Sequence, residues 1–264
     1  MPVSHNNLSE ELQAFQGYWE GGYHEGDPLN PLSRSTYGQW GYISVLHATY
    51  LRCIKPYITP ETVVLEIGPG RGAWTKAMLA AKEVWVLDAV SAEHNRFYEY
   101  LGHPGNVRYF QVKDFECNEL PDDKFNYMFS YGCMCHISFA GITEYATHIF
   151  PKLKRGSNCF WMIADYEKYN NSVRNINSLS IWKALSPPKS RRSIPLIYLF
   201  KYLMRRHAVQ FIEPDNDDKA RSGVRWYDAG IARTCAMLEG VGFQIADADV
   251  GTCLRDPIIH FIKP

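Results

Sequence analysis

The sequence predicts an α/β fold: a doubly wound, mostly parallel seven-stranded sheet with an antiparallel C-terminal strand pair and a helical cap insertion. Apolar segments of strand length alternate with helical patterns between residues 62 and 165. A glycine-rich turn separates the first of these strands from the first helix, and two strands follow each other directly near the C-terminus. Near-continuous apolar strands are typical of a parallel sheet that helices cover on both faces. These three observations together predict the α/β class.

Each predicted strand is a short run rich in β-branched and aromatic residues. The strands cover residues 63–67, 84–88, 107–112, 126–132, 158–165, 243–250 and 257–263. The predicted helices cover residues 9–16, 41–55, 73–81, 92–101, 141–153 and 227–239. We expect the helix over residues 141–153 to end at residues 154–156, because two basic residues and a glycine are typical of a helix C-terminus. The last two strands are joined only by a loop, which predicts an antiparallel pair at the sheet edge.

Composition and charge narrow the class of protein. The 264-residue chain has 28 basic and 28 acidic residues, and this zero net charge argues against a general nucleic-acid binder. No apolar run reaches the roughly 20 residues that a membrane span needs, and the polar N-terminus lacks a signal-peptide core. We therefore expect a cytoplasmic protein with no integral membrane association. The seven cysteines include no C-x-x-C pair, so we expect reduced core residues and no metal site.

The glycine-rich turn carries the strongest functional signal. Three glycines follow the first predicted strand, at Gly68, Gly70 and Gly72. Glycines let a backbone pass close to a ligand, and the helix that follows directs its free N–H groups at that ligand. Asp88 ends the next strand about 20 residues after Gly68, the spacing at which an acid meets ribose hydroxyls. The turn and the acid together predict a site for an adenosine-type cofactor.

The glycine spacing alone admits two kinds of cofactor. Gly68-x-Gly70-x-x-Ala73 also fits the dinucleotide fingerprint, so the alternative of another class is an NAD-dependent oxidoreductase or a non-catalytic nucleotide-binding module. Three features favour S-adenosylmethionine instead. Glu66 lies two residues before the first glycine, where an acid can reach the amino acid end of that cofactor. Gly72 completes a G-x-G-x-G spacing, and the chain ends in an antiparallel strand pair.

Over residues 41–165 and 226–264 the sequence resembles the class I, Rossmann-like S-adenosylmethionine-dependent methyltransferases of the small-molecule type. The segment VVLEIGPGRGAWT is similar to the first motif of that family, E/D-x-G-x-G-x-G. The resemblance implies S-adenosylmethionine as the cofactor. It also implies that Asp88 binds the ribose, with Ala89 and Val90 beside it.

Two further segments match the pattern of this family. The segment KDF resembles the place where an acid contacts the adenine amino group and its neighbour packs on the ring, which implies that role for Asp114 and Phe115. The segment FNYMFSYGCMCHIS resembles the fourth motif, which often has a VLHHL-like ending. His136 falls on the second histidine of that ending, and Cys135 replaces the first. Tyr131 ends this strand, so we expect it beside the cofactor.

These motifs divide the chain into four predicted parts. Residues 41–165 form the cofactor-binding core, and residues 226–264 form its C-terminal part. Residues 1–40 form an aromatic segment that we expect to fold over the cofactor as a lid. Residues 166–225 interrupt the α/β alternation and form a predicted cap over the substrate.

Methyl transfer to a hydroxyl oxygen needs a base that takes the hydroxyl proton. His136 is the first candidate, because histidine has an unperturbed pKa of about 6.5. Asp165 follows another strand end and is the second candidate, either as the base or as a group that orients it. Both residues have a structural alternative, the packing of a strand end. The alternative reaction is N-methylation of a small amine, which needs less help from a base.

The acceptor is expected to be a small molecule, and the cap carries the indications of its charge. Arg191 and Arg192 belong to a basic stretch, residues 189–207, that contains no acid. Arginine recognises phosphate bidentately, so this stretch predicts an anionic acceptor such as a phosphorylated or nucleotide-linked sugar. The alternatives are a solvated helix face and contact with anionic lipid. Tyr23 and His24 would contact the acceptor from the lid.

Overall fold

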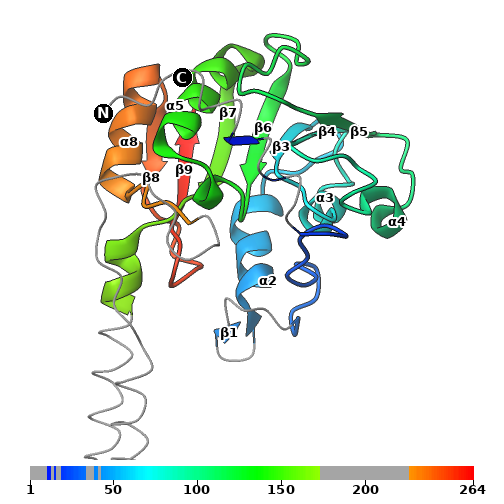
Figure 1. Ribbon diagram of the computed structural model, residues 1–264, viewed down its shortest axis with the longest axis horizontal. Coiled ribbons are helices and arrows are strands. Elements are labelled where there is room, and N and C mark those ends of the chain that lie inside the picture. Colours follow the sequence, from blue (N-terminus) through cyan, green and yellow to red (C-terminus); the bar gives the residue numbers. More distant parts are fainter. Residues whose placement is uncertain (1–10, 13–14, 16–18, 34–38, 41–42, 173–225) are drawn as a thin grey trace, which may run out of the picture.

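The computed structural model describes residues 11–12, 15, 19–33, 39–40, 43–172 and 226–264, which contain a seven-stranded sheet with helices on both faces (Figure 1). The strands are β3 (Val63–Ile67), β4 (Glu83–Asp88), β5 (Val107–Gln111), β6 (Phe125–Ser130), β7 (Leu153–Met162), β8 (Gln244–Asp247) and β9 (Ile258–Ile262). Their order across the sheet is β5-β4-β3-β6-β7-β9-β8. Neighbouring strands pair in parallel except at β9, which runs antiparallel to both β7 and β8. This confirms the predicted fold class and its antiparallel C-terminal pair.

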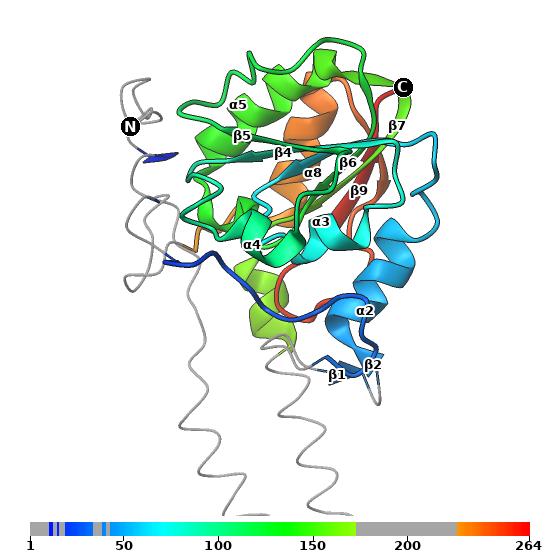
Figure 2. The ribbon, with the colours of Figure 1, turned by 90° about the vertical axis from the view of Figure 1, so that its right-hand side faces the viewer.

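Helices lie on both faces of the sheet (Figure 2), and on each face an apolar layer lies between the sheet and the helices. One face is covered by α5 (Phe139–Ile149) and α8 (Ile231–Val241). The other face is covered by α2 (Val45–Thr49), α3 (Ala73–Ala77) and α4 (Phe97–Leu101). Leu65 and Ile67 of β3 belong to the first layer and Val64 to the second, because successive side chains of a strand point to opposite faces.

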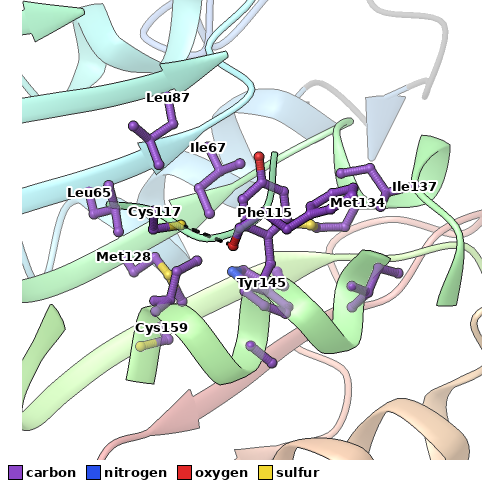
Figure 3. Packing of buried hydrophobic residues seen from close by; sticks show 14 of the residues in the cluster. Leu65, Ile67, Leu87, Phe115, Cys117, Met128, Met134, Ile137, Tyr145 and Cys159 are labelled. Carbon is purple, nitrogen blue, oxygen red and sulfur yellow. Dashed lines mark hydrogen bonds between the residues drawn. The ribbon is translucent and has the colours of Figure 1, made fainter. Parts of the chain in front are cut away.

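The layer beneath α5 positions the ends of the central strands (Figure 3). Ile67 of β3 and Leu87 of β4 pack in the same cluster as Tyr145 of α5. The Tyr145 ring meets the Phe115 ring edge to face, with 4.7 Å between the ring centroids. Burying an apolar side chain of this size stabilises the fold by about 1.5–3 kcal/mol, and close-packed layers move little. The carboxyl ends of β3 and β4 are therefore fixed relative to α5.

The helix α5 ends earlier than the sequence predicts. It ends at Ile149, and a single 3-10 turn at Phe150–Lys152 follows. Pro151 has no N–H group, so it cannot continue an α-helix. Residues 154–156, predicted as the helix end, are instead exposed residues at the start of β7. That prediction was wrong because two basic residues and a glycine suit an exposed strand start as well as a helix end.

Other predicted helices are shorter or begin later than expected. The helices predicted over residues 73–81 and 92–101 are reduced to α3 and α4. The helix α8 begins at Ile231, because Gly230 has a left-handed φ of 71° that an α-helix does not contain. The segment over residues 41–55 contains β2 (Ile43–Ser44), which pairs with β1 (Gln39–Trp40), followed by α2 and a π-helical turn (Tyr50–Ile54).

Most of the predicted cap lies outside the described residues. Residues 166–172 are helical, and the described chain resumes at Trp226. The Ser172 hydroxyl donates to the Leu254 carbonyl oxygen at 2.6 Å, and the Trp226 indole N–H donates to the Asp256 carboxylate at 3.1 Å. Both ends of the cap are therefore attached to the connection between β8 and β9. No helix within the described ranges is long and apolar enough to cross a membrane.

Candidate functional site

The predicted glycine-rich turn lies where β3 ends and α3 begins. Gly68 and Gly70 have left-handed φ angles of 71° and 52°. A Cβ on Gly68 would lie 2.4 Å from the Cβ of Cys133, and a Cβ on Gly70 would lie 2.8 Å from the carbonyl oxygen of Tyr23. Both positions therefore require glycine, for the backbone conformation and for the lack of space. The turn is held between the end of β6 and the N-terminal segment.

Asp88 ends β4 beside this turn, and three donors hold its carboxylate. Oδ2 accepts the Gly70 N–H at 3.3 Å and the Asn95 side-chain amide at 3.0 Å, and Oδ1 accepts the Val90 N–H at 3.1 Å. Removal from water raises the pKa of Asp88 to about 6, while the N–H groups of Val90 and Gly70 act in the opposite direction. At neutral pH the carboxylate is therefore ionised and fixed in place.

A cavity opens beside these residues, at the carboxyl ends of β3, β4 and β6. Open α/β sheets bind ligands at the carboxyl ends of their strands. The residues predicted for the site that line the cavity are Tyr23, Gly68, Gly70, Asp88, Ala89, Val90 and His136. The cavity brings together the glycine turn, the fixed acid and the histidine.

His136 lies in the cavity wall, at the end of a 3-10 turn (Met134–His136) that follows β6. The other two residues of the turn, Met134 and Cys135, are fully buried and anchor it. The half-buried His136 ring packs against the Trp19 ring, with 5.2 Å between the ring centroids. A histidine that is fixed by buried neighbours and open to a cavity has the placement that a general base needs.

Residues 19–24, here called the strap, cross the glycine turn. The Arg71 N–H donates to the Tyr23 carbonyl oxygen at 3.1 Å. The Arg71 guanidinium adds a bond of 2.7 Å from Nε to the Gly21 carbonyl oxygen. The side chains of Trp19 and Tyr23 line the cavity from the strap. These contacts give the predicted lid its attachment to the glycine turn.

Glu66 and Gly72 support the turn from outside the cavity. The buried Glu66 carboxyl accepts the Thr75 hydroxyl at 2.6 Å, and burial raises the pKa of Glu66 to about 8. Gly72 has a φ of 96°, and a Cβ there would lie 3.0 Å from the Phe97 ring. The structure thus places the Glu66 carboxyl against α3, and its contact with the amino acid end of a cofactor stays a prediction.

Three other residues predicted to contact the cofactor stand behind or beside the cavity wall. Tyr131 is buried against Trp74, with 4.5 Å between the ring centroids. Phe115 is 4% exposed and packs on Tyr145, which lines the cavity. Asp114 is exposed, and its carboxylate accepts the Glu116 N–H at 3.0 Å. The adenine contacts of Asp114 and Phe115 remain predictions from the family resemblance.

Asp165, predicted as the second candidate base, does not line the cavity. Its buried carboxylate accepts the Lys168 N–H at 2.6 Å and the Ile231 N–H at 2.8 Å. His24 lies outside the cavity on the Tyr100 ring, with 5.0 Å between the ring centroids. Arg191 and Arg192 lie outside the described residues. Among the side chains that the structure describes, no group of three His, Cys, Asp or Glu residues could hold a metal ion.

The cavity wall also contains residues to which sequence reasoning gave no role in the site. Asn95 holds Asp88, and Cys133 packs against Gly68. Cys133 follows β6 directly, so its place beyond a strand end was the available signal. Asn95 lies in the connection from β4 to α4, where a polar side chain close to the acid was a weaker signal. Tyr145 belongs to an ordinary helical pattern and gave no signal.

No family model and no curated protein matches the chain, but solved structures do. One is an S-adenosylmethionine-dependent methyltransferase from Mesorhizobium loti, at 14% identity and a TM-score of 0.53, covering 83% of this chain and 98% of that one. A second is magnesium protoporphyrin IX methyltransferase from Synechocystis PCC 6803 with bound SAH (S-adenosylhomocysteine), at 14% identity and a TM-score of 0.51, covering 83% and 81%. A third is mitomycin 7-O-methyltransferase, at 13% identity and a TM-score of 0.50, covering 85% and 55%. The chain has the fold of the class I S-adenosylmethionine-dependent methyltransferases.

Proposed function

We propose that the protein binds S-adenosylmethionine in the cavity beside the glycine turn and transfers its methyl group to an oxygen of a small molecule. The observation that carries this proposal is the convergence of Gly68, Gly70 and Asp88 on one cavity at the carboxyl ends of β3 and β4. The fold supports the proposal, because methyltransferases of known structure share it.

The residues around the cavity suit an adenosine that carries an amino acid tail. Gly68 and Gly70 line the cavity and carry no side chains, so a ligand can lie against their backbone. The Asp88 carboxylate, which Asn95 and Val90 hold in place, is suited to accept hydrogen bonds from ribose hydroxyls. A side chain on Gly68 would collide with Cys133, and one on Gly70 with the Tyr23 carbonyl oxygen, so either would displace the cavity wall.

The remaining cofactor contacts follow from the family resemblance. On this proposal Ala89 and Val90 lie beside the ribose, and both residues line the cavity. Asp114 and Phe115 hold the adenine. Phe115 would act through Tyr145, which it contacts and which lines the cavity.

When bound, S-adenosylmethionine supplies a methyl group activated by its sulfonium. In the proposed reaction His136 would take the proton of the acceptor hydroxyl, so that the oxygen could accept the methyl group that the cofactor would supply. The Trp19 ring restrains the His136 ring through their contact. Trp19 and Tyr23 exclude water from the cavity, and their π faces attract a cation.

N-methylation of a small amine is the second candidate reaction, and the composition of the cavity wall favours it. The described wall contains aromatic rings and one carboxylate, from Asp88, and no lysine or arginine. Such a wall suits a neutral or cationic acceptor. The anionic acceptor predicted from the cap depends on Arg191 and Arg192, which the structure does not describe.

A thermal-shift comparison of S-adenosylhomocysteine with NAD tests the class of cofactor. A ligand at one hundred times its dissociation constant stabilises the folded protein by about 2.7 kcal/mol. We expect S-adenosylhomocysteine to raise the Tm and NAD to leave it unchanged. A shift with NAD alone would reject the methyltransferase in favour of an oxidoreductase or a nucleotide-binding module.

Assays of His136→Asn on a panel of alcohols and amines, scored by S-adenosylhomocysteine formation, test the reaction. For an alcohol acceptor, kcat should fall about 10²-fold or more, with the affinity for S-adenosylhomocysteine unchanged. His103→Asn is the matched control, because His103 is exposed and stacks on Tyr98 away from the cavity. Turnover of amines alone, unaffected by His136→Asn, would replace O-methylation with N-methylation. Turnover of amines without turnover of phosphorylated or nucleotide sugars would remove the sugar acceptor.

A further inference from the structure

The described surface has a second hollow, here called the arginine groove. It is lined by Arg71, Arg96, Glu99 and Tyr100, none of which lines the cofactor cavity. The strap runs between the two hollows, because Gly21 packs on the two arginines while Tyr23 lines the cavity. The proposed methyl transfer gives this groove no role.

Two guanidinium groups converge in the arginine groove. A Cβ built on Gly21 would lie 3.1 Å from Nη2 of Arg71 and 3.5 Å from Nε of Arg96. The described residues include no carboxylate paired with Arg71. Arg96 has a weak counter-ion in Glu99 at 3.9 Å, since the two side chains are 57% and 73% exposed. Two like charges held this close favour an anion between them.

Further basic groups surround the same tyrosine. Lys76 Nζ lies 5.6 Å from the centroid of the Tyr100 ring and 3.7 Å from an Asp27 carboxylate oxygen. The His24 ring packs against Tyr100 at an interplanar angle of 55°, and burial, followed by the charge of Arg71, lowers the pKa of His24. The neutral imidazole leaves Arg71, Arg96 and Lys76 as the charged donors, against two acids, the half-buried Asp27 and the exposed Glu99. The groove therefore has a positive surplus.

We propose that the arginine groove is a binding site for a phosphate-bearing ligand, separate from the cofactor cavity. The planar guanidinium fork of arginine matches two phosphate oxygens at once, and two arginines line this groove. The Tyr100 phenol adds a neutral donor in the groove wall. A free phosphate and the phosphate of a phosphorylated metabolite share this chemistry.

Occupation of the groove would also act on the strap. Arg71 and Arg96 pack on Gly21, Arg71 donates to its carbonyl oxygen at 2.7 Å, and the Gly21 N–H donates to the His94 carbonyl oxygen at 3.0 Å. A bridging phosphate would hold these contacts together, so it should slow the release of S-adenosylhomocysteine. Coupling between two sites is reciprocal, so S-adenosylhomocysteine should tighten phosphate binding by the same factor. This coupling, unlike the phosphate site itself, rests on the proposed function.

Calorimetric titrations of the full chain without cofactor test the site. The probes are inorganic pyrophosphate, orthophosphate and glycerol 3-phosphate, at constant ionic strength. Arg96→Gln should weaken pyrophosphate binding at least about tenfold, whereas Glu99→Gln, which removes the competing acid, should strengthen it several-fold. The matched control is Arg52→Gln, which loses the same charge at an exposed arginine paired with Asp247 at 3.2 Å, and should change binding less than about twofold.

Comparison of the probes and of the variants distinguishes the possible ligands from an adventitious ion. Tighter binding of glycerol 3-phosphate than of orthophosphate identifies a phosphorylated metabolite as the ligand, and the reverse identifies free phosphate. Equal pyrophosphate binding by the wild type and Arg96→Gln, or binding abolished by chloride at the same ionic strength, would show an adventitious ion only and overturn the proposal. If S-adenosylhomocysteine fails to bind while Arg96-dependent pyrophosphate binding persists, the proposed function is rejected. The phosphate site in the arginine groove is then still supported.

Discussion

Asp88 and Asp165 have similar positions in the sequence, each at or just after the end of a parallel strand. Their carboxylates nevertheless have different surroundings in the structure. Asp88 lines the cavity, and its carboxylate is held by the N–H groups of Gly70 and Val90 and by the Asn95 amide. Asp165 accepts the N–H groups of Lys168 and Ile231. It thereby joins the start of the helix over residues 166–172 to the start of α8.

The difference lies in the chain that follows each acid. After Asp88 the backbone continues through Ala89 and Val90 along the cavity. After Asp165 a helix begins at once, and the free N–H groups of its first turn attract the nearest carboxylate. Glu66 is a third case, since its carboxyl accepts the Thr75 hydroxyl of α3. All three acids have donors, but only Asp88 is held at the wall of the cavity, so only Asp88 is available to a ligand there.

The largest expected effect separates the two aspartates by stability. Asp165→Ala should lower the free energy of unfolding by about 1–3 kcal/mol, because it leaves two half-buried backbone N–H groups without their acceptor. Denaturant titration measures this loss. The affinity of the folded variant for S-adenosylhomocysteine should stay within about twofold of the wild type. A stable variant that binds the cofactor normally but has lost turnover would restore Asp165 as a catalytic residue.

Substitution of Asp88 should instead reduce ligand affinity and have little effect on stability. Asp88→Ala should weaken S-adenosylhomocysteine binding about 30- to 100-fold, because two ribose hydroxyls lose a charged acceptor. The free energy of unfolding should change by less than about 1.5 kcal/mol, since the loss of hydrogen bonds is offset by the removal of a desolvated charge. Calorimetry and denaturant titration of the same preparation give both numbers. A large loss of stability with unchanged affinity would show that Asp88, like Asp165, has a structural role and does not bind the ligand.

The pH dependence should sharpen the contrast at Asp88. Its pKa is raised from 3.8 to about 6 in the folded protein, so its contribution to stability is fully present below pH 3.8 and is lost as the pH rises through 6. Ligand affinity should instead increase as the pH rises, because ribose hydroxyls donate to the ionised carboxylate. Below pH 6 the affinity for S-adenosylhomocysteine should fall about tenfold per pH unit. The slope should vanish in Asp88→Asn, and an equal slope there would assign it to another group.

The smallest effect is expected at Glu66. Burial raises its pKa to about 8, so the side chain is largely protonated at pH 7 and glutamine imitates its neutral form. Glu66→Gln should change the free energy of unfolding by less than about 1 kcal/mol and the affinity for S-adenosylhomocysteine by less than about threefold. The same calorimetric and denaturant measurements apply. A tenfold loss of affinity would instead show that the Glu66 charge reaches the cofactor.

Local patterns were sufficient to predict the strands, the glycine turn and the position of Asp88 at the end of a strand, because each depends on residues close together in the sequence. The helix end at Ile149 was predicted wrongly, although Pro151 marked it. The position of the strap could not be predicted from local sequence patterns. Its contacts join Gly21 to Arg71 and Gly22 to Asn95, whose carbonyl oxygen would lie 2.3 Å from a Cβ on Gly22. Contacts so distant along the chain leave no periodicity to read.

The same limit explains the division among the candidate site residues. Gly68 and Gly70 were found because their spacing reflects a local backbone path with left-handed φ angles. Asp165 could not be separated from Asp88, because its second partner, Ile231, comes after the insertion. A sequence shows that a carboxylate stands near a strand end. The donors that engage it are decided by tertiary packing.

The most direct test of the central claim is a calorimetric titration of S-adenosylhomocysteine into Gly70→Val and Gly102→Val. Both glycines have left-handed φ angles, 52° and 79°, so valine strains both backbones. A Cβ on Gly102 would meet nothing within 4 Å, whereas a Cβ on Gly70 would lie 2.8 Å from the Tyr23 carbonyl oxygen beside the cavity. We predict binding close to wild type for Gly102→Val and at least about a hundredfold loss for Gly70→Val. Equal affinities in the two variants would contradict a cofactor that lies against the glycine turn.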